Sequence, residues 1–497
     1  MEKRRTKIKN IPPTGSEGST YEQKSHYHRR PRYPGILADQ KIREILSVAS
    51  LIITICLISY FISMSASPFI RFVFSVVVLG IDGAVLKYLL GLEGSLGMII
   101  VRLSGGREVI AWIKNRLGKH WNTIADMGLV LAFGVSSKFA FRHISNRTFV
   151  MGLLFFLAFA FVILPNSASI TFSLIQIPLE SIQAASGDIR LSIIAMVVVL
   201  LFGVVGFAML GILASAAAIL AAMISFVMGN TAALAAAAPG IYPVLPYFTI
   251  PLFEGLIALV VLMVVHEGSH GIAAMIARIR VKSTGLITFG FIPVGAFVDI
   301  DEKQLDETRD VDNARVSVAG SAANLFTALV FFIPTALLMA SLPIFQQDIL
   351  TVTATVKNIS FEGAPITVGT NITAVNGIPV SNAAQYLVVL GNTTPNSTLV
   401  LMTDQGESRT QLIGDVPGFV VAQPMKPEFL WIKPVFATLG LLTILNLLIG
   451  IINLLPIPSF DGHRLFKIIF KKKWVVDTFA AIIVIAFLMN IIPWVWQ

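Results

Sequence analysis

Charged residues are scarce in this chain, and this scarcity defines its class. Of the 497 residues only 13% are Asp, Glu, Lys or Arg, whereas 55% are hydrophobic and the mean hydropathy is +0.79. Soluble proteins are roughly 25% charged. The composition therefore excludes an ordinary soluble protein and predicts a polytopic α-helical membrane protein.

Cysteine is almost absent as well. The single cysteine, Cys56, lies in an apolar run, which excludes a disulfide within the chain and a cysteine-based metal site. In a soluble protein the formal net charge of +9 could suggest a nucleic-acid partner. In a membrane protein, however, Lys and Arg gather in cytosolic loops and face anionic lipid. We therefore expect a lipid bilayer around the chain and no nucleic acid.

Apolar runs long enough to cross a bilayer, which takes roughly 20 residues, recur along the chain. They are 47–66, 70–90, 147–165, 191–228, 252–277, 316–342, 430–456 and 474–495. The fourth run is too long for one span, and the orientation of its neighbours requires an even number of crossings. We therefore expect a hairpin of two spans there, turning near Gly211, and about nine spans in total.

Basic residues orient these spans, because Lys and Arg favour the cytosolic side. Residues 278–315 and 459–474 are rich in both and are expected in the cytosol, as is the segment 92–146 inside an N-terminal transmembrane region, 47–245. The segment 343–427 is poor in them and carries Asn-x-Ser/Thr patterns, which favour the exterior.

The first residues, 1–46, are polar and basic and lack the apolar core of a signal peptide. We expect a disordered cytosolic tail there, and hence a multi-pass protein of the cell membrane with its N-terminus in the cytosol.

The exterior segment has the pattern of a small folded domain. The run TVTATVKNIS alternates like a strand, and the later VNGIPV has the pattern of a hairpin between short strands. The segment resembles a PDZ domain in its circularly permuted form, and such modules bind extended peptide ends by adding a strand to a sheet edge. A generic small β-sandwich is the alternative.

The run VVHEGSHGIAA, 264–274, places His266, Glu267 and His270 inside an apolar span. On an α-helix, residues four apart lie on one face, so both imidazoles can reach one metal ion. Glu267 points about 100° away, as a base acting on metal-bound water would. Ionisable residues are costly in lipid and indicate function there. Packing by hydrogen bonds alone is the alternative, and it does not explain the spacing.

A catalytic zinc usually takes three protein ligands and keeps one position open. The run NLLPIPSFDG, 453–462, offers the third, because Pro456 and Pro458 break the helix just before Asp461. Irregular backbone at membrane depth survives only when it is buried in protein or lines a water-filled cavity. Asp461 is therefore the expected third ligand, with His463 as the alternative.

Three motifs together resemble the site-2 protease family, the intramembrane zinc metalloproteases. They are HEGSH, the segment AGSAANLF at 319–326, and NLLPIPSFDG. The resemblance covers 245–495 and implies a three-helix catalytic core in 246–342 and 428–497. One departure is His463, where many members have a second glycine.

The resemblance also assigns roles to the matching residues. It implies Zn²⁺ held by His266, His270 and Asp461, with Glu267 as the general base. Asn324 and Asn453 would bind the substrate backbone or the oxyanion; an asparagine that only holds helices together is the alternative.

The activity implied is hydrolysis of peptide bonds within or near transmembrane segments of membrane-protein substrates, as in regulated intramembrane proteolysis. The Gly- and Pro-interrupted run 281–300 is expected to form a membrane-re-entrant β-hairpin that offers an edge strand to an unwound substrate helix. An amphipathic cytosolic loop is the alternative.

Two other functions compete with proteolysis. A catalytically inactive, substrate-binding chaperone on the same scaffold would not need all of these residues. A metal transporter would need polar residues along a whole pathway, and 316–342 and 474–495 offer almost none. The substrate and the oligomeric state stay open.

Overall fold

The computed structural model describes residues 38–64, 68–163, 189–230, 233–234, 237, 240–241, 250–355, 361–394, 396–412 and 419–495. Residues 1–37 of the predicted disordered tail, 1–46, lie outside these residues, and its last part is wrong, because 40–46 form the start of a helix, α1 (Gln40–Ser63). The chain divides into two compact units, one of Met1–Ile99 with Phe289–Phe291 and one of Ile100–Thr288 with Ile292–Gln497.

The first unit contains a pair of apolar helices. These are α1 (Gln40–Ser63) and α2 (Pro68–Leu90), followed by strand β1 (Glu93–Ser95) and the start of β2 (Met98–Arg102). Asp82 on α2 is buried and accepts a hydrogen bond of 2.6 Å from the hydroxyl of Ser50 on α1. A polar contact of this kind joins helices in an apolar environment. The pair corresponds to the first two predicted spans.

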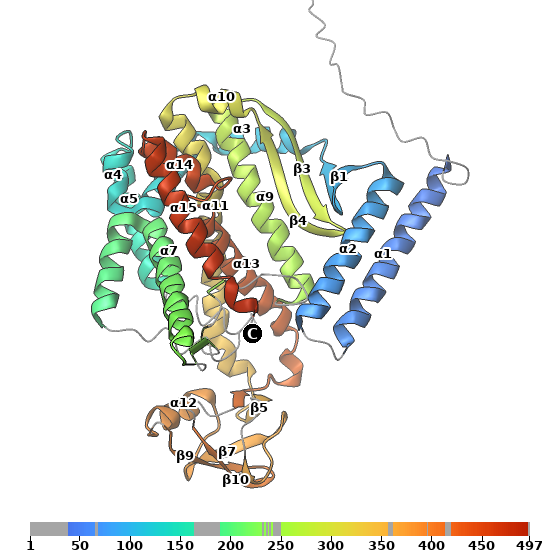
Figure 1. Cartoon of the computed structure of the whole chain (residues 1–497), viewed down its shortest axis with the longest axis vertical. Helices are drawn as coiled ribbons and strands as arrows, with labels where there is room; N and C mark the ends of the chain where they lie inside the picture. Colours follow the sequence, from blue (N-terminus) through green and yellow to red (C-terminus); the bar gives the residue numbers. More distant parts are fainter. Residues whose placement is uncertain are drawn as a thin grey trace, which may run out of the picture. The chain divides into compact units, whose positions relative to one another are not determined.

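The second unit contains the remaining helices (Figure 1). They are α3 (Gly106–Phe133), α4 (Ser137–Ala140), α5 (Asn146–Ala158), α7 (Ile189–Val227), α9 (Leu252–Ile276), α10 (Glu302–Glu307), α11 (Asp310–Phe345), α12 (Ala383–Gly391), α13 (Ile432–Ile452), α14 (Asp461–Ile469) and α15 (Lys473–Met489). Short 3₁₀ or π turns lie at Gly134–Ser136, Phe159–Ile163, Pro427–Phe429 and Ile492–Val495.

Among the described residues, 8 helical segments are long and apolar enough to cross a membrane. They are Gln40–Ser63, Ile70–Leu90, Gly106–Ala140, Asn146–Ile163, Val197–Val227, Leu252–Ile276, Asp310–Phe345 and Ile432–Ile452. This confirms the predicted class of a polytopic helical membrane protein.

The turn predicted near Gly211 is misplaced, although the chain does fold back within this segment. Two helical stretches of α7 meet at Gly203, and a Cβ on Gly206 would lie 3.1 Å from the carbonyl oxygen of Val198. In one continuous helix residues eight apart would be about 12 Å apart. Helix α7 continues through Gly211, and its break lies at Gly203, with φ 63° and ψ −153°. A Cβ built on Gly203 would lie 2.6 Å from the carbonyl oxygens of both Leu131 and Ala132. The kink therefore arises where the backbone of α7 packs directly against the end of α3.

Helix α3 was not expected as a membrane-length segment. It lies within the segment expected in the cytosol, yet together with α4 it forms one of the membrane-length segments. Its first half carries charges such as Arg107, Lys114 and Arg116, and its second half is apolar and buried from Leu129 to Phe133. Because of these charges, the sequence alone does not show that the apolar half belongs to a membrane-length helix. The cytosolic placement of the whole segment stays a prediction.

The hairpin predicted at 281–300 is present in the structure, as strands β3 (Val281–Phe289) and β4 (Ile292–Ile300). In the second unit the chain leaving β2 pairs with β3, since the Leu103 N–H donates to the Thr284 carbonyl over 2.9 Å. In the strand order β2-β3-β4, β4 lies at the edge. Figure 1 shows β4 running beside α9, and the two elements are in contact.

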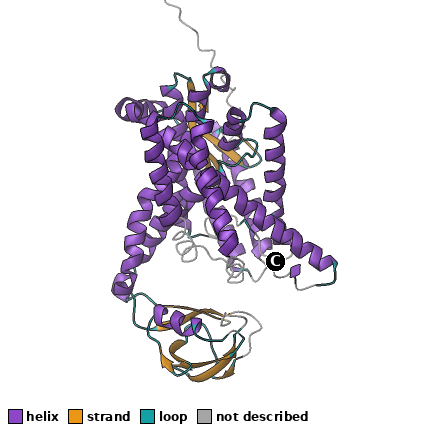
Figure 2. Cartoon of the chain, turned by 90° about the vertical axis from the view of Figure 1, so that its left-hand side faces the viewer, coloured by secondary structure: helices purple, strands orange, loops and turns teal. Residues whose placement is uncertain are grey.

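The insert after α11 is a separate α+β domain (Figure 2). Its strands are β5 (Leu350–Thr355), β6 (Glu362–Gly363), β7 (Asn371–Val375), β8 (Ile378–Pro379), β9 (Thr398–Thr403), β10 (Gly406–Gln411) and β11 (Phe419–Ala422). They follow the order β11-β5-β7-β9-β10-β6, with β8 paired to β7, around a hydrophobic core of their own. The PDZ resemblance of this domain stays a prediction.

Helices α9, α11 and α13 pack against one another and form the centre of the main hydrophobic core. Small residues allow the close approach: a Cβ on Gly450 of α13 would lie 3.0 Å from the side chain of Leu325 on α11. Such contacts are typical of helices in lipid, where packing of small residues replaces the hydrophobic effect. Helices α9 and α11 carry the HEGSH and AGSAANLF motifs, and the NLLPIPSFDG motif follows the end of α13.

Candidate metal centre

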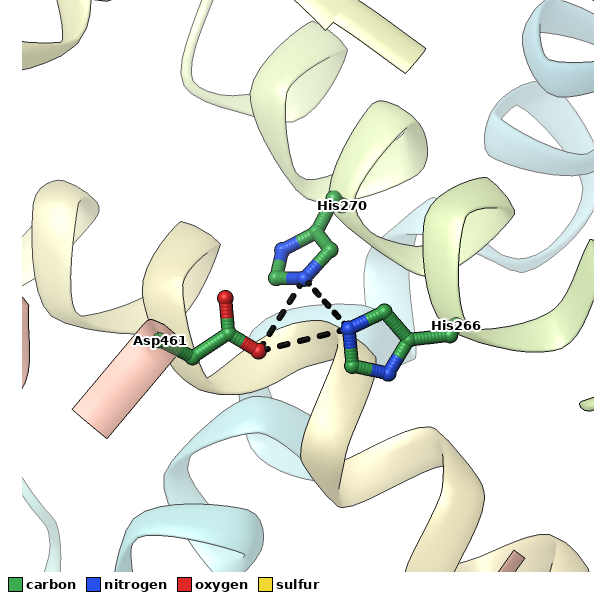
Figure 3. Close-up of side chains that lie close together, drawn as sticks. All are labelled: His266, His270 and Asp461. Carbon is green, nitrogen blue, oxygen red and sulfur yellow. Dashed lines mark hydrogen bonds and ion pairs between the residues drawn. The ribbon is translucent and has the colours of Figure 1, made fainter. Parts of the chain in front are cut away.

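Three side chains from two distant segments converge in this core (Figure 3). His266 and His270 come from α9 and Asp461 from the first residue of α14. The two Nε2 atoms are 3.3 Å apart, and Oδ2 of Asp461 lies 3.4 Å from that of His266 and 3.3 Å from that of His270. The histidines are only 7% and 8% exposed. The three atoms thus form a nearly equilateral triangle in a buried place.

The size of this triangle fits a metal ion. In a tetrahedral site, bonds of about 2.0–2.1 Å place two ligand atoms about 3.3–3.4 Å apart, because the edge of a tetrahedron is about 1.63 times the bond. All three measured distances fall on this value. Two imidazoles and a carboxylate are also a donor set that zinc accepts. The cluster can therefore hold a metal ion with one tetrahedral position left for water.

Asp461 reaches the histidines because α13 ends at Ile452 and the chain restarts as a helix at Asp461. The Gly462 N–H donates to the Asn453 carbonyl over 2.8 Å and closes the connecting loop. A Cβ on Gly462 would collide with the carbonyl of Leu454, so this tight closure requires glycine. The predicted break around Pro456 and Pro458 therefore aims the carboxylate, as expected.

Contacts behind the triangle fix how each ligand is oriented. Nδ1 of His270 lies 2.7 Å from the Val316 carbonyl, which can only accept, so Nδ1 carries the proton and Nε2 keeps its lone pair for a metal. The hydroxyl of Ser321 donates to Oδ2 of Asp461 over 3.1 Å. Val316 and Ser321 both belong to α11. This helix therefore orients His270 of α9 through Val316 and Asp461 of α14 through Ser321.

Gly320 has a steric reason to be glycine. A Cβ at this position would collide with the imidazole of His270 and would lie 2.8 Å from Cε1 of His266. The backbone of α11 is therefore in direct contact with both rings. The glycine of the AGSAANLF motif leaves the space in which the two histidines stand.

Glu267 lines a cavity of about 370 Å³ together with both histidines, Asp461 and Asn453. Its Oε2 accepts a hydrogen bond of 3.1 Å from the Val298 N–H of the edge strand β4. Val298 and Ile300 line the same cavity. The cavity is therefore lined by the three clustered side chains, by a carboxylate outside the cluster and by the edge of a sheet.

The two asparagines predicted to bind substrate occupy different places. Asn453 lines the cavity, with Nδ2 3.3 Å from Nε2 of His266. Asn324 is 0% exposed and lies behind the ring, with Nδ2 3.0 Å from Nδ1 of His266. Its Oδ1 has no hydrogen-bond partner among the described residues. A direct contact of Asn324 with substrate therefore has no support from this geometry, although its role stays a prediction.

His463, the alternative ligand, lies outside the triangle. Burial, followed by the positive charge of Lys467, lowers the pKa of its imidazole. The next residue, Arg464, forms an ion pair with Asp306 of α10 over 2.5 Å. The structure thus separates Asp461, which faces the histidines, from residues that follow it on α14.

Three contacts of the site escaped the sequence analysis. The Val316 carbonyl and the Val298 N–H are backbone groups, and no side-chain pattern marks them. Ser321 did leave a signal, because it follows Gly320 within the AGSAANLF motif.

Comparisons with known proteins give a family for the segment that contains this cluster. Residues 254–493, which contain all three ligands, match the model of peptidase family M50. A protein of Methanocaldococcus jannaschii, named only as uncharacterized, is 24% identical over 225 residues, which is 44% of this chain and 57% of that protein. The chain thus spans a little over half of the length of this relative.

Proposed function

Residues 254–493 belong to peptidase family M50, the site-2 protease family, and from this premise we propose that the protein is an intramembrane zinc metalloprotease. It hydrolyses peptide bonds within or near transmembrane segments of membrane-protein substrates. The observation that carries the proposal is the buried triangle of His266, His270 and Asp461, whose sides match a tetrahedral zinc site. The protein works as a multi-pass protein of the cell membrane, with its N-terminus in the cytosol.

His266, His270 and Asp461 would hold the Zn²⁺. When bound, the ion supplies Lewis-acid chemistry, lowering the pKa of a water in its open position to about 7 and polarising the scissile carbonyl. Glu267 faces the same cavity and takes up the proton of the attacking water, then delivers it to the leaving amine. The N–H of Val298 orients this carboxylate before substrate enters.

The two asparagines divide their work. Asn453 presents an amide donor at the cavity wall and stabilises the developing oxyanion. Asn324 orients His266, because that ring binds a metal through Nε2 only when Nδ1 carries the proton and faces an acceptor. A half-turn of the Asn324 amide brings Oδ1, which has no partner among the described residues, to face Nδ1.

Strand β4 supports a route for the substrate. A peptide bond in an α-helix is shielded, so the substrate must unwind, and an unwound segment can pair with an open sheet edge. The edge strand β4 contributes Val298 and Ile300 to the cavity wall. A segment added to β4 would bring its backbone to Glu267. The PDZ-like domain outside the membrane would act on the substrate's exterior part, as a filter or as a reader of its tail.

The general-base role has a direct test. Cleavage of a single-span model substrate by the full chain in vesicles is measured together with bound zinc. Glu267→Gln should lower cleavage by about 10²- to 10⁴-fold, the usual contribution of a general base, and leave the zinc content unchanged. Glu254→Gln, the same change at the start of α9, is the matched control and should have no effect.

Full activity of Glu267→Gln would remove the general-base role. A wild-type protein that binds zinc and cleaves nothing would favour the catalytically inactive, substrate-binding chaperone. A wild-type protein without stoichiometric zinc would refute the metal site itself.

A further inference from the structure

Helix α3 lies outside the segment that matches the peptidase family, yet it contacts α9, which carries both histidines, and α11, which orients them. We propose that α3 is a positioning element of the metal centre, in which Asp126 and Gly128 hold α11 in the place where it supports His266 and His270. The inference rests on the proposed metal site and extends it to residues that no motif marks. Three independent contacts carry it.

The first contact is a buried ion pair. Oδ1 and Oδ2 of Asp126 each lie 2.8 Å from a guanidinium nitrogen of Arg315, so the pair is bidentate. The side chain of Asp126 is only 8% exposed and that of Arg315 19%. Nε2 of His143 gives Asp126 a third contact at 3.1 Å. A bidentate pair fixes direction as well as distance, unlike apolar packing.

Arg315 lies directly before the residue of α11 that orients His270. The next residue, Val316, holds the carbonyl that receives the Nδ1 proton of His270 over 2.7 Å. A helix rises 1.5 Å per residue, so a slip of α11 by one residue would move this carbonyl out of hydrogen-bond reach. The ion pair from α3 is anchored one residue away and prevents such a slip.

The second contact sets how closely α11 approaches the histidines. A Cβ on Gly128 of α3 would collide with the Cβ of Ala322. On the opposite side of α11, a Cβ on Gly320 would collide with the imidazole of His270. The backbone of α11 therefore stands between α3 and the two rings with no spare room on either side.

The third contact is between α3 and α9 itself. A Cβ on Gly271, the residue after His270, would lie 2.8 Å from Cδ1 of Ile110 on α3 and 3.1 Å from Val298 on β4. Helix α3 thus packs against α9 at His270 and against α11 at the two points described. Movement of α3 would change the distance between the helices that form the metal site.

Two substitutions in the full chain test this inference. Arg315→Lys keeps the charge and loses the bidentate fork. Gly128→Ala pushes α11 towards the histidines and replaces neither residue of the ion pair. The readouts are zinc affinity, the visible absorption spectrum of the Co²⁺-substituted protein, and kcat and KM for a single-span substrate. Thermal unfolding identifies any variant that does not fold.

We expect each variant to lose about 10- to 100-fold in zinc affinity, as is usual when outer contacts of metal ligands are changed, with an altered Co²⁺ spectrum. The change in activity should fall on kcat, with KM unchanged. Asp310→Asn breaks an exposed ion pair with Lys471 at the start of the same helix and is the matched control. It should leave all readouts as in the wild type.

Folded Arg315→Lys and Gly128→Ala variants with wild-type zinc affinity and Co²⁺ spectrum would overturn the inference. The Co²⁺ spectrum needs no proteolysis, so these outcomes are separate from a failure of the proposed function. A wild-type chain that binds neither Zn²⁺ nor Co²⁺ would overturn both proposals.

Discussion

Replacing Gly320 by alanine tests the metal site most directly, because one methyl group meets two ligands. The added Cβ would lie 2.7 Å from Cδ2 of His270 and 2.8 Å from Cε1 of His266, whereas ordinary contact begins at 3.4 Å. Nε2 of His270 lies closer still and would collide with the added Cβ, so the ring of His266 would have to move by about 0.6 Å and that of His270 by more. Even the smaller movement is about three times the 0.2 Å within which metal–ligand distances are held.

The helix cannot relieve the clash by moving the other way. Ala322, two residues further along α11, packs so closely against Gly128 of α3 that even a Cβ on Gly128 would collide with it. The displacement therefore falls on the imidazoles, and we expect zinc affinity to fall by at least about 10- to 100-fold. That is about 1.4–2.8 kcal/mol. Cleavage should fall by about 100-fold at saturating zinc, as expected for reacting groups misplaced by about 1 Å.

The assay is zinc binding by the purified full chain, measured by competition with a chelator, beside cleavage of a single-span substrate. Gly268→Ala is the matched control, because it adds the same methyl group inside the HEGSH motif and meets no atom of the described residues within 4 Å. Wild-type zinc affinity in Gly320→Ala would refute the inferred contact between α11 and the two histidines.

The remaining predictions separate roles that the structure places side by side. Asn324→Ala should lower zinc affinity about 10- to 100-fold, because it leaves His266 without its orienting partner. Asn453→Ala should leave zinc affinity unchanged and lower kcat about 10²- to 10³-fold, as loss of an oxyanion donor does. The reverse pattern in zinc titrations and kinetics would exchange the two roles. Val298→Pro removes the N–H that holds Glu267 and should lower kcat, since an edge strand tolerates proline. Val294→Pro, on the same edge and away from Glu267, should instead raise KM, and equal effects of the two prolines would contradict a separate contact with Glu267.

The residues of the cluster could be predicted from local patterns, and the structure brings them together; their role as metal ligands stays a prediction. His266 and His270 lie one turn apart on one helix, so their spacing alone brings the imidazoles together. Asp461 follows two prolines that end a helix and precedes a glycine that its loop requires, so the sequence marks where the chain turns. The distances among the three could not be predicted, because they depend on how α9 and α14 pack.

The errors in the fold come from non-local contacts. A glycine can mark a turn or a close approach of two backbones, and the sequence does not distinguish them. Gly211 was expected to turn the chain and lies inside a helix, whereas Gly203 breaks the helix because the end of α3 packs against it. Helix α3 was itself missed as a membrane-length segment, since its charged first half masks the apolar second half.

The same helix shows why the family motifs do not describe the whole metal centre. Motifs mark residues that could hold the ion or that line the cavity, and those found among the described residues lie within 254–493. The distance between α9 and α11, however, depends on residues without functional groups. Gly320 lies where α11 contacts the histidines of α9, and Gly128 and Ala322 lie where α11 packs against α3. In lipid no hydrophobic effect presses helices together, so small residues and one directional ion pair must define this spacing. The triangle of ligand atoms therefore depends on α3, although α3 contributes no atom to it.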